Sequence, residues 1–147
     1  MAKLLRVPLE GVETQSESQD PSNGARVVFT GLVRGDTNGA TTIALEYDAY
    51  EPMAIQAMKD LEAEALQLFG VKRALVIHRL GRVPVGQISV VALVESGHRK
   101  DAFAACEWLM NEVKKRVPIW KKDIGPNGET WQHPLSGNLN PTRQESP

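Results

Sequence analysis

Residues 87–118, QISVVALVESGHRKDAFAACEWLMNEVKKRVP, carry the strongest structural signal in the chain, a buried strand followed at once by a helix. The segment 87–95 is apolar at most positions, which is typical of a strand covered on both faces, so we expect it at the centre of a sheet. Ser96 is a favourable N-cap residue, and the helix is predicted to begin there. Pro118 is predicted to end it, because the residue before a proline is forced out of the helical region.

The apolar side chains of this helix recur on one face, which predicts that it packs against the sheet. The predicted buried stripe is Ala102, Cys106, Leu109 and Val113, flanked by Phe103 and Met110. Cys106 is the only cysteine, and its place on the stripe indicates a small core residue and not a nucleophile. A lone thiol also excludes an internal disulfide framework and argues against a cysteine-based metal site.

A second helix is predicted between Pro52, which suits a first helical turn, and Gly70, which favours a stop. Its apolar stripe consists of Ala54, Met58, Leu61, Ala65 and Leu68.

Strands are predicted at residues 3–9, 25–34, 41–50 and 72–78, and residues 119–123 are predicted to be extended. Pro8 restricts the first of these to the edge of a sheet. The third strand is expected to present Ile43, Leu45, Tyr47 and Ala49 on one face.

Polar segments separate these elements. Residues 10–24 are predicted to be a surface loop and residues 35–41 a turn. Residues 78–87 are predicted to form a long hairpin, in which the turn residues are Gly81, Pro84 and Gly86.

This order of elements predicts one α+β domain over residues 1–147, with two principal helices on a mainly antiparallel sheet. Such a length leaves room for a hydrophobic core. The polar segment 135–147 is predicted to be a flexible tail.

Composition limits the function. The net charge of −1 argues against a nucleic-acid-binding protein, so any cationic site must come from local clustering. No stretch approaches the ~20 apolar residues of a membrane span. The N-terminal residues lack the features of a signal peptide, so we expect a cytoplasmic protein.

Three basic groups are candidates for such clustering. Five of the nine residues at 114–122 are basic and surround Trp120. Cations interact favourably with the C-terminal end of a helix, so a solvated helix end is one interpretation of this basic group. The tryptophan favours the other interpretation, a shaped binding surface. His98 and Arg99 lie at the start of the predicted helix, where free N–H groups already attract anions, so they indicate either an anion site or a local cap.

The third candidate is Arg34, at the end of a predicted strand beside a glycine-bearing turn, where a solvated strand end is an equally simple interpretation. His78, Arg79 and Arg82 are also basic, and we interpret them as structural residues of the hairpin.

Helix length constrains how these groups can act together. With a rise of 1.5 Å per residue, His98 and Lys114 lie ~24 Å apart on one helix. They therefore either serve different sites or meet across a dimer, in which a two-fold axis creates two composite sites.

Four sequence blocks together resemble the large subunit of molybdopterin synthase: VVFTGLVRG, LEYDAYEPMA, HRLGRVPVGQISV, and SGHRKDAF with WLMNEVKKRVPIWKKD. They occur in order between Gly24 and Trp131. The resemblance implies an α/β hammerhead-type fold with an added small β subdomain. It also implies a sulfurtransferase that converts cyclic pyranopterin monophosphate into molybdopterin.

The same resemblance implies the partners. Both sulfurs arrive as the thiocarboxylated C-terminus of a small ubiquitin-like subunit, and a homodimer of the large subunit sits within a heterotetramer. No cofactor, resident metal, nucleic acid or membrane is involved.

The resemblance also assigns residues by position. Lys114 and Lys121 match the catalytic lysines, which also contact the substrate, and His98 and Arg99 match a pair that the second protomer supplies. The remaining substrate-binding matches are Phe29, Leu32, Val33, Arg34, Lys122 and Asp123. A family arginine beyond Trp131 has no match before Arg143.

Two other functions fit part of the pattern. A dimeric module could dock a ubiquitin-like tail without performing chemistry, but it would not need Arg34, His98 and Arg99. An unrelated phosphoester-binding enzyme could use the same cations without any small partner.

Overall fold

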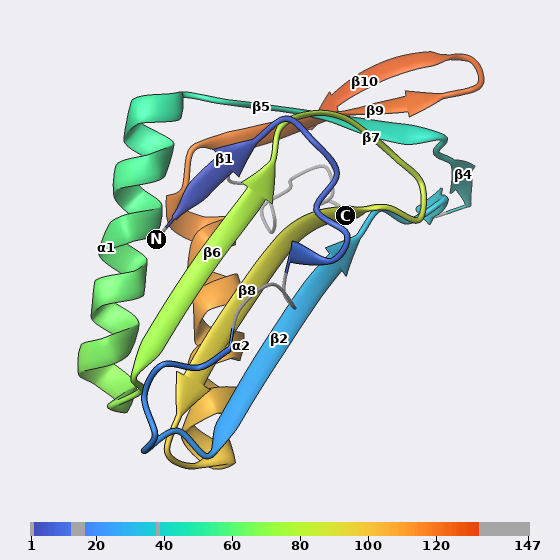
Figure 1. The fold of residues 1–147 in the computed structure, drawn as a ribbon. Coiled ribbons are helices and arrows are strands. Elements are labelled where there is room, and N and C mark those ends of the chain that lie inside the picture. Colours follow the sequence, from blue (N-terminus) through green and yellow to red (C-terminus); the bar gives the residue numbers. More distant parts are fainter. Residues whose placement is uncertain (1, 13–16, 38, 133–147) are drawn as a thin grey trace.

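A four-stranded sheet carries both helices on one face (Figure 1). The structure is a computed structural model that describes residues 2–12, 17–37 and 39–132. The elements are β1 (Lys3–Leu5), β2 (Ala25–Leu32), β3 (Asp36–Thr37), β4 (Ala40–Thr41), β5 (Ala44–Ala49), α1 (Glu51–Phe69), β6 (Arg73–Arg79), β7 (Gly81–Pro84), β8 (Ile88–Ser96), α2 (Arg99–Arg116), β9 (Ile119–Gly125) and β10 (Gly128–Gln132).

The main sheet has the strand order β1-β6-β8-β2. Strand β1 is parallel to β6, and the other pairs are antiparallel. Strand β8 is central and buried along its whole length, as its unbroken apolar run predicts. Strand β2 lies at an edge, next to β8 only.

The hydrophobic core fills the space between the main sheet and the helices. Helix α1 packs against β6, and α2 packs against β8 and β2. Both helices contribute fully buried small and apolar side chains, among them Ala54, Met58, Leu61, Ala102 and Leu109. The opposite face of the sheet forms a smaller apolar cluster, on which Leu9 of the N-terminal segment is fully buried.

A second sheet, β10-β9-β5-β7, lies across the end of the main sheet where α2 and β2 finish (Figure 1). All its strand pairs are antiparallel. Its own buried cluster combines Val33, Leu45 and Val83, with Tyr47 packed against them.

The α+β fold with two helices, a mainly antiparallel arrangement and an added β subdomain is confirmed. The strands predicted at 72–78 and 87–95 are β6 and β8, and each begins and ends one residue later than predicted. Gly70 ends α1 in a left-handed conformation with φ 68°, and α2 ends just before Pro118. The described parts of the predicted loop at 10–24 contain no strand and no α-helix. The predicted tail at 135–147 lies outside the described residues.

Several details of the prediction were wrong. Ser96 does not cap α2, because it continues β8 by pairing with Ala25, and His98 is the N-cap. Leu68 is exposed near the C-terminal end of α1, and Ile43 is exposed because it precedes β5. The predicted hairpin at 78–87 and turn at 35–41 each contain strands, namely β7 and the β3–β4 pair.

Phe103 was also predicted near the buried stripe, but it is 62% exposed. Trp108, on the opposite flank of α2, packs edge-on against Phe69 of α1, with ring centroids 5.8 Å apart. By helical spacing, the flank with Phe103, Met110 and Lys114 therefore faces away from α1, toward the outer edge at β2.

A buried carboxylate ties α1 to the sheet. Glu62 accepts hydrogen bonds from the backbone N–H of Ala2 (3.2 Å) and of Val76 (2.8 Å). Pairing of β1 with β6 begins only at Lys3 and Ile77, so the carboxylate supplies the acceptor that a longer β1 would provide to Val76. Burial raises the pKa of Glu62, and the two N–H donors offset part of that effect.

Replacing Glu62 by Gln should therefore destabilise the protein. Glutamine has one acceptor oxygen, so one buried N–H loses its partner, and we expect a loss of about 1–3 kcal/mol in the free energy of unfolding. Urea denaturation at neutral pH measures this. Glu64→Gln is the matched control, because Glu64 forms only a surface ion pair with Arg116 and its loss should matter much less. Equal effects of both substitutions would contradict the assigned role of Glu62.

Candidate active site

Three of the predicted site cations lie at the end of the main sheet that carries the second sheet. Strand β2 leads into Val33, which is buried among residues of the second sheet, and Arg34 follows directly. Helix α2 begins beside the start of β2, where Ser96 pairs with Ala25, and packs along β2. Its last turn, which contains Lys114, therefore lies toward the end of β2.

Lys121 enters the same region from β9, which starts two residues after the C-cap of α2. It is paired with Tyr47 of β5. The fold thus places Arg34, which follows β2, at the same end of the main sheet as Lys114 and Lys121, which come 80 or more positions later in the sequence.

His98 and Arg99 lie at the opposite end of α2. Helix α2 contains 18 residues, so its length is ~27 Å, and His98 and Lys114 are ~24 Å apart along it. Both His98 and Arg99 are exposed, and no side-chain hydrogen bond caps the helix at His98. Within one chain, the structure does not bring this pair to the Lys114 end.

Strand alternation separates the residues of β9. Lys121 and Asp123 share a face with their partners Tyr47 and Leu45, toward the apolar cluster of the second sheet. Lys122 projects from the other face. Its ammonium group lies 2.9 Å from the carboxylate of Glu129 on β10, and this hydrogen bond raises the pKa of Lys122.

Tyr47, the β5 partner of Lys121, packs against His78 of β6. Their rings meet edge to face, with centroids 4.9 Å apart. Nδ1 of His78 lies 2.8 Å from the carbonyl oxygen of Arg79, which can only accept, so Nδ1 carries the proton. Burial lowers the pKa of His78 to about 4, and the charge of Lys121 acts in the same direction. His78 is therefore neutral at physiological pH, which agrees with its predicted structural role.

Sequence reasoning did not connect Tyr47 with Lys121. Burial raises the pKa of the Tyr47 hydroxyl, with the nearby charge of Asp123 as a smaller contribution, so the phenol stays protonated. The alternation of apolar residues placed Tyr47 on the inner face of its strand, but only the β5–β9 register identifies its neighbour.

An apolar surface follows the free edge of the main sheet. Phe29 and Leu32 on β2 are 42% and 58% exposed, and Phe103 on α2 is also exposed. We call these three residues the β2 edge surface. Val33 differs from them: its side chain is 3% exposed, and its backbone N–H and carbonyl groups are hydrogen-bonded to Gln87 and Gly86.

Cys106 belongs to the core, as predicted. Its Sγ lies 3.8 Å from the carbonyl oxygen of Ala92, and burial raises the pKa of the thiol, which opposes formation of a thiolate. Across residues 2–12, 17–37 and 39–132, no three His, Cys, Asp or Glu side chains are grouped so as to hold a metal ion. No helix in the same segments is long and apolar enough to span a membrane. Arg143 lies outside these segments.

Comparison with known proteins gives a consistent result. The family model for "MoaE protein" matches residues 6–116. The molybdopterin synthase catalytic subunit of Pyrococcus abyssi is 43% identical over 110 residues, covering 75% of this chain and 74% of the relative. The subunit of the same name from Staphylococcus aureus strain Mu50 is 36% identical over 146 residues, covering 97% and 99%.

Solved structures agree. The crystal structure of molybdopterin synthase from Staphylococcus aureus superposes with a TM-score of 0.83 at 36% identity, covering 88% of this chain and 95% of the other. A complex of subunits 1 and 2 of the molybdopterin-converting factor from Helicobacter pylori 26695 gives a TM-score of 0.75 at 30% identity, covering 95% and 99%.

The buried His78 predicts a pH dependence of stability. Its pKa falls from 6.5 when unfolded to about 4 when folded, so the folded state binds fewer protons and its stability is lost as pH falls below 6.5. At 1.36 kcal/mol per pKa unit, the loss reaches about 2 kcal/mol at pH 5. Chemical denaturation between pH 7.5 and 4.5 measures it. In His78→Asn, which keeps a donor for the Arg79 carbonyl but does not titrate, this loss should disappear; an unchanged pH profile would assign it to other groups.

Proposed function

This chain belongs to the MoaE family of molybdopterin synthase catalytic subunits, and on that premise we propose how its residues bind the pterin and the sulfur donor. The substrate, cyclic pyranopterin monophosphate, carries a phosphate. We assign Arg34, Lys114 and Lys121 of one protomer, with His98 and Arg99 of a second, to a cationic pocket around it. Phe29, Leu32 and Asp123 complete the proposed wall, and the buried Val33, hydrogen-bonded to Gly86 and Gln87, positions Arg34 beside it.

The charges of this set support the assignment. Within the described residues, Arg6, Arg26 and Arg116 form ion pairs with carboxylates, whereas Arg34, Arg99 and Lys114 form none. A cation without an internal carboxylate remains available for a phosphate, to which it makes strong charge-assisted hydrogen bonds. Lys122 is engaged by Glu129 on the other face of β9, so we assign it to the β9–β10 hairpin and not to the pocket.

The length of α2 is the main observation that supports the proposed dimer. A ligand the size of a pterin cannot reach His98 and Lys114 across the ~24 Å that separates them on one helix. A two-fold axis at the free edge of β2 would pair that edge with itself in antiparallel orientation. The start of β2, next to His98, would then lie beside the end of β2, next to Arg34, in the second copy.

The β2 edge surface favours this arrangement. Phe29, Leu32 and Phe103 place exposed apolar area along an edge strand, and such area is typical of a surface that another chain covers. Each dimer would contain two composite pockets. The family heterotetramer then requires one small subunit per pocket, and the Helicobacter pylori relative, solved as a complex of two subunits, supports such a partner.

Sulfur arrives on the thiocarboxylated tail of the small subunit, so this chain needs no nucleophilic thiol, and the buried Cys106 is consistent with that. We propose that Lys114 stabilises the oxyanion that forms when the acyl carbon of the tail is attacked, or transfers a proton there. Lys121, held above neutral His78, would act likewise on the oxygen that leaves the pterin. These reactions fit the cytoplasm, the location that we propose.

Lys114→Ala should lower turnover by about two to three orders of magnitude, as expected for loss of one charged donor at a developing oxyanion. The assay mixes the purified chain with a thiocarboxylated small subunit and cyclic pyranopterin monophosphate and measures the dithiolene product. Lys115→Ala is the matched control, since the adjacent ammonium is solvated and 3.5 Å from Glu112. Near-normal turnover of Lys114→Ala, with unchanged thermal stability, would remove Lys114 from the mechanism.

Mixed dimers test the composite pocket. A dimer of one Lys114→Ala chain and one His98→Ala chain has one pocket with both residues intact and one pocket with neither. Such heterodimers, isolated with two different affinity tags, should recover about half of the wild-type turnover. Homodimers of either variant are the controls. Absence of recovery in a folded heterodimer would show that the two residues act within one protomer or at separate sites.

A further inference from the structure

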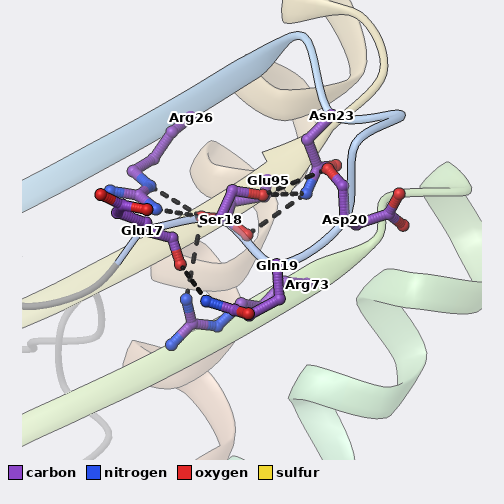
Figure 2. A network of polar contacts seen from close by, with 8 residues as sticks. All are labelled: Glu17, Ser18, Gln19, Asp20, Asn23, Arg26, Arg73 and Glu95. Carbon is purple, nitrogen blue, oxygen red and sulfur yellow. Dashed lines mark hydrogen bonds and ion pairs between the residues drawn. The ribbon is translucent and has the colours of Figure 1, made fainter.

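A charge cluster built around one buried carboxylate, Glu95, lies three residues before the His98–Arg99 pair in the sequence (Figure 2). Glu95, near the end of β8, is 2% exposed. It lies in one row across three strands, with Arg26 of β2 and Arg73 of β6 as its direct neighbours. This row is on the face of the main sheet opposite the helices, in line with the apolar side chains of Val91 and Leu93.

The carboxylate of Glu95 is shared among three partners. Its Oε2 accepts from Nε and Nη2 of Arg26, at 2.7 and 2.6 Å, and lies 3.7 Å from Nη1 of Arg73. Its Oε1 accepts from Nδ2 of Asn23, at 3.3 Å. The two arginines lie on the strands on either side of β8 and would repel one another without this carboxylate between them, so the row depends on Glu95.

Asn23 connects this cluster to the loop before β2. Its Nδ2 also lies 2.8 Å from Oγ of Ser18, which donates in turn to the carbonyl oxygen of Asp20 (Figure 2). The carboxylate of Asp20 accepts from the backbone N–H and the hydroxyl of Ser22, at 2.8 and 2.6 Å. The loop 18–23 is therefore ordered by its own polar groups and anchored at Glu95.

The residue that follows this loop, Gly24, is in close backbone contact with the turn between β8 and α2. The N–H of Gly24 donates to the carbonyl oxygen of Ser96 at 2.9 Å. A Cβ atom on Gly24 would lie 2.6 Å from the carbonyl oxygen of Gly97, so the two backbones meet as closely as glycine allows. The next residue is His98, the N-cap of α2, which has no side-chain capping bond of its own.

We infer that Glu95 is a positioning residue for the reaction: through Asn23 and Arg26 it fixes the loop and turn that aim His98 and Arg99 at the pocket of the second protomer. The inference rests on the proposed function, because it concerns how that function's cations are oriented. Glu95 touches no substrate and acts only through the turn.

The test measures kcat and KM for cyclic pyranopterin monophosphate, with a thiocarboxylated small subunit in excess. Asn23→Ala removes the link between loop and carboxylate and leaves the ion pairs; Glu95→Gln removes the charge. Because a displacement near 1 Å in a binding group can cost up to a hundredfold, we expect each to lower kcat/KM by about tenfold, mainly through KM. Asn23→Ala decides the question by itself if Glu95→Gln does not fold.

Two further experiments distinguish a positioning role of Glu95 from a general loss of protein stability. Glu62→Gln is the matched control, since Glu62 is also a buried carboxylate but anchors α1 and β6, and its kcat/KM should stay unchanged at a similar loss of melting temperature. Adding Asn23→Ala to the His98→Ala, Arg99→Ala double variant should lower kcat/KM no further, because the loop acts through those two residues.

The outcomes are distinguishable. If Arg99→Ala lowers kcat/KM but Asn23→Ala does not, or if Asn23→Ala multiplies the loss already caused by His98→Ala with Arg99→Ala, the positioning role is overturned and the proposed pocket stands. If Arg99→Ala itself has no effect, the pocket assignment fails, and the positioning role fails with it.

Discussion

Burial of one face of α2 against β8 and β2 is the interaction on which the rest of the structure depends. Ala102, Leu109 and the other residues of the stripe are held by close packing against Ala92 and Val94, where a change of one methylene group is felt. This packing fixes the course of α2 along β8 and β2. It therefore also fixes where the two ends of the helix, and the cations on them, can be.

Two buried carboxylates fix chain segments whose positions apolar packing alone does not specify. Glu62 supplies an acceptor where β1 is too short to pair with β6, and Glu95 holds two arginines in register across β2, β8 and β6. Each carboxylate is compensated by several donors, without which its burial would cost several kcal/mol. Both lie where a chain segment must be fastened to the sheet.

The sequence was sufficient for features that depend on local periodicity. The apolar run of β8, the stripe of α2 and the stop at Gly70 follow from side-chain spacing and from the conformational freedom of glycine. Features that depend on pairing were missed. Ser96 is a good cap in isolation, but its pairing with Ala25 extends β8. Strand β7 is too short to give a recognisable sequence pattern, and it forms because it pairs with β5. The cluster around Glu95 was missed for the same reason, since only the register places Arg26 and Arg73 beside it.

The candidate site, too, has features that the sequence predicts and features that depend on strand pairing. Clustering of lysines after α2 indicated a cationic region, and the spacing of His98 and Lys114 already required two chains or two sites. The face on which each lysine projects depends on the phase of β9, which the basic run does not encode: Lys121 shares a face with Tyr47, whereas Lys122 faces Glu129. Adjacent lysines with equal charge thus have different environments: Lys122 pairs with Glu129 of the hairpin, and Lys121 lies beside Tyr47, which packs against the neutral, buried His78. This difference is why the proposed chemistry assigns the two lysines separate roles, although the sequence alone presents them as a pair.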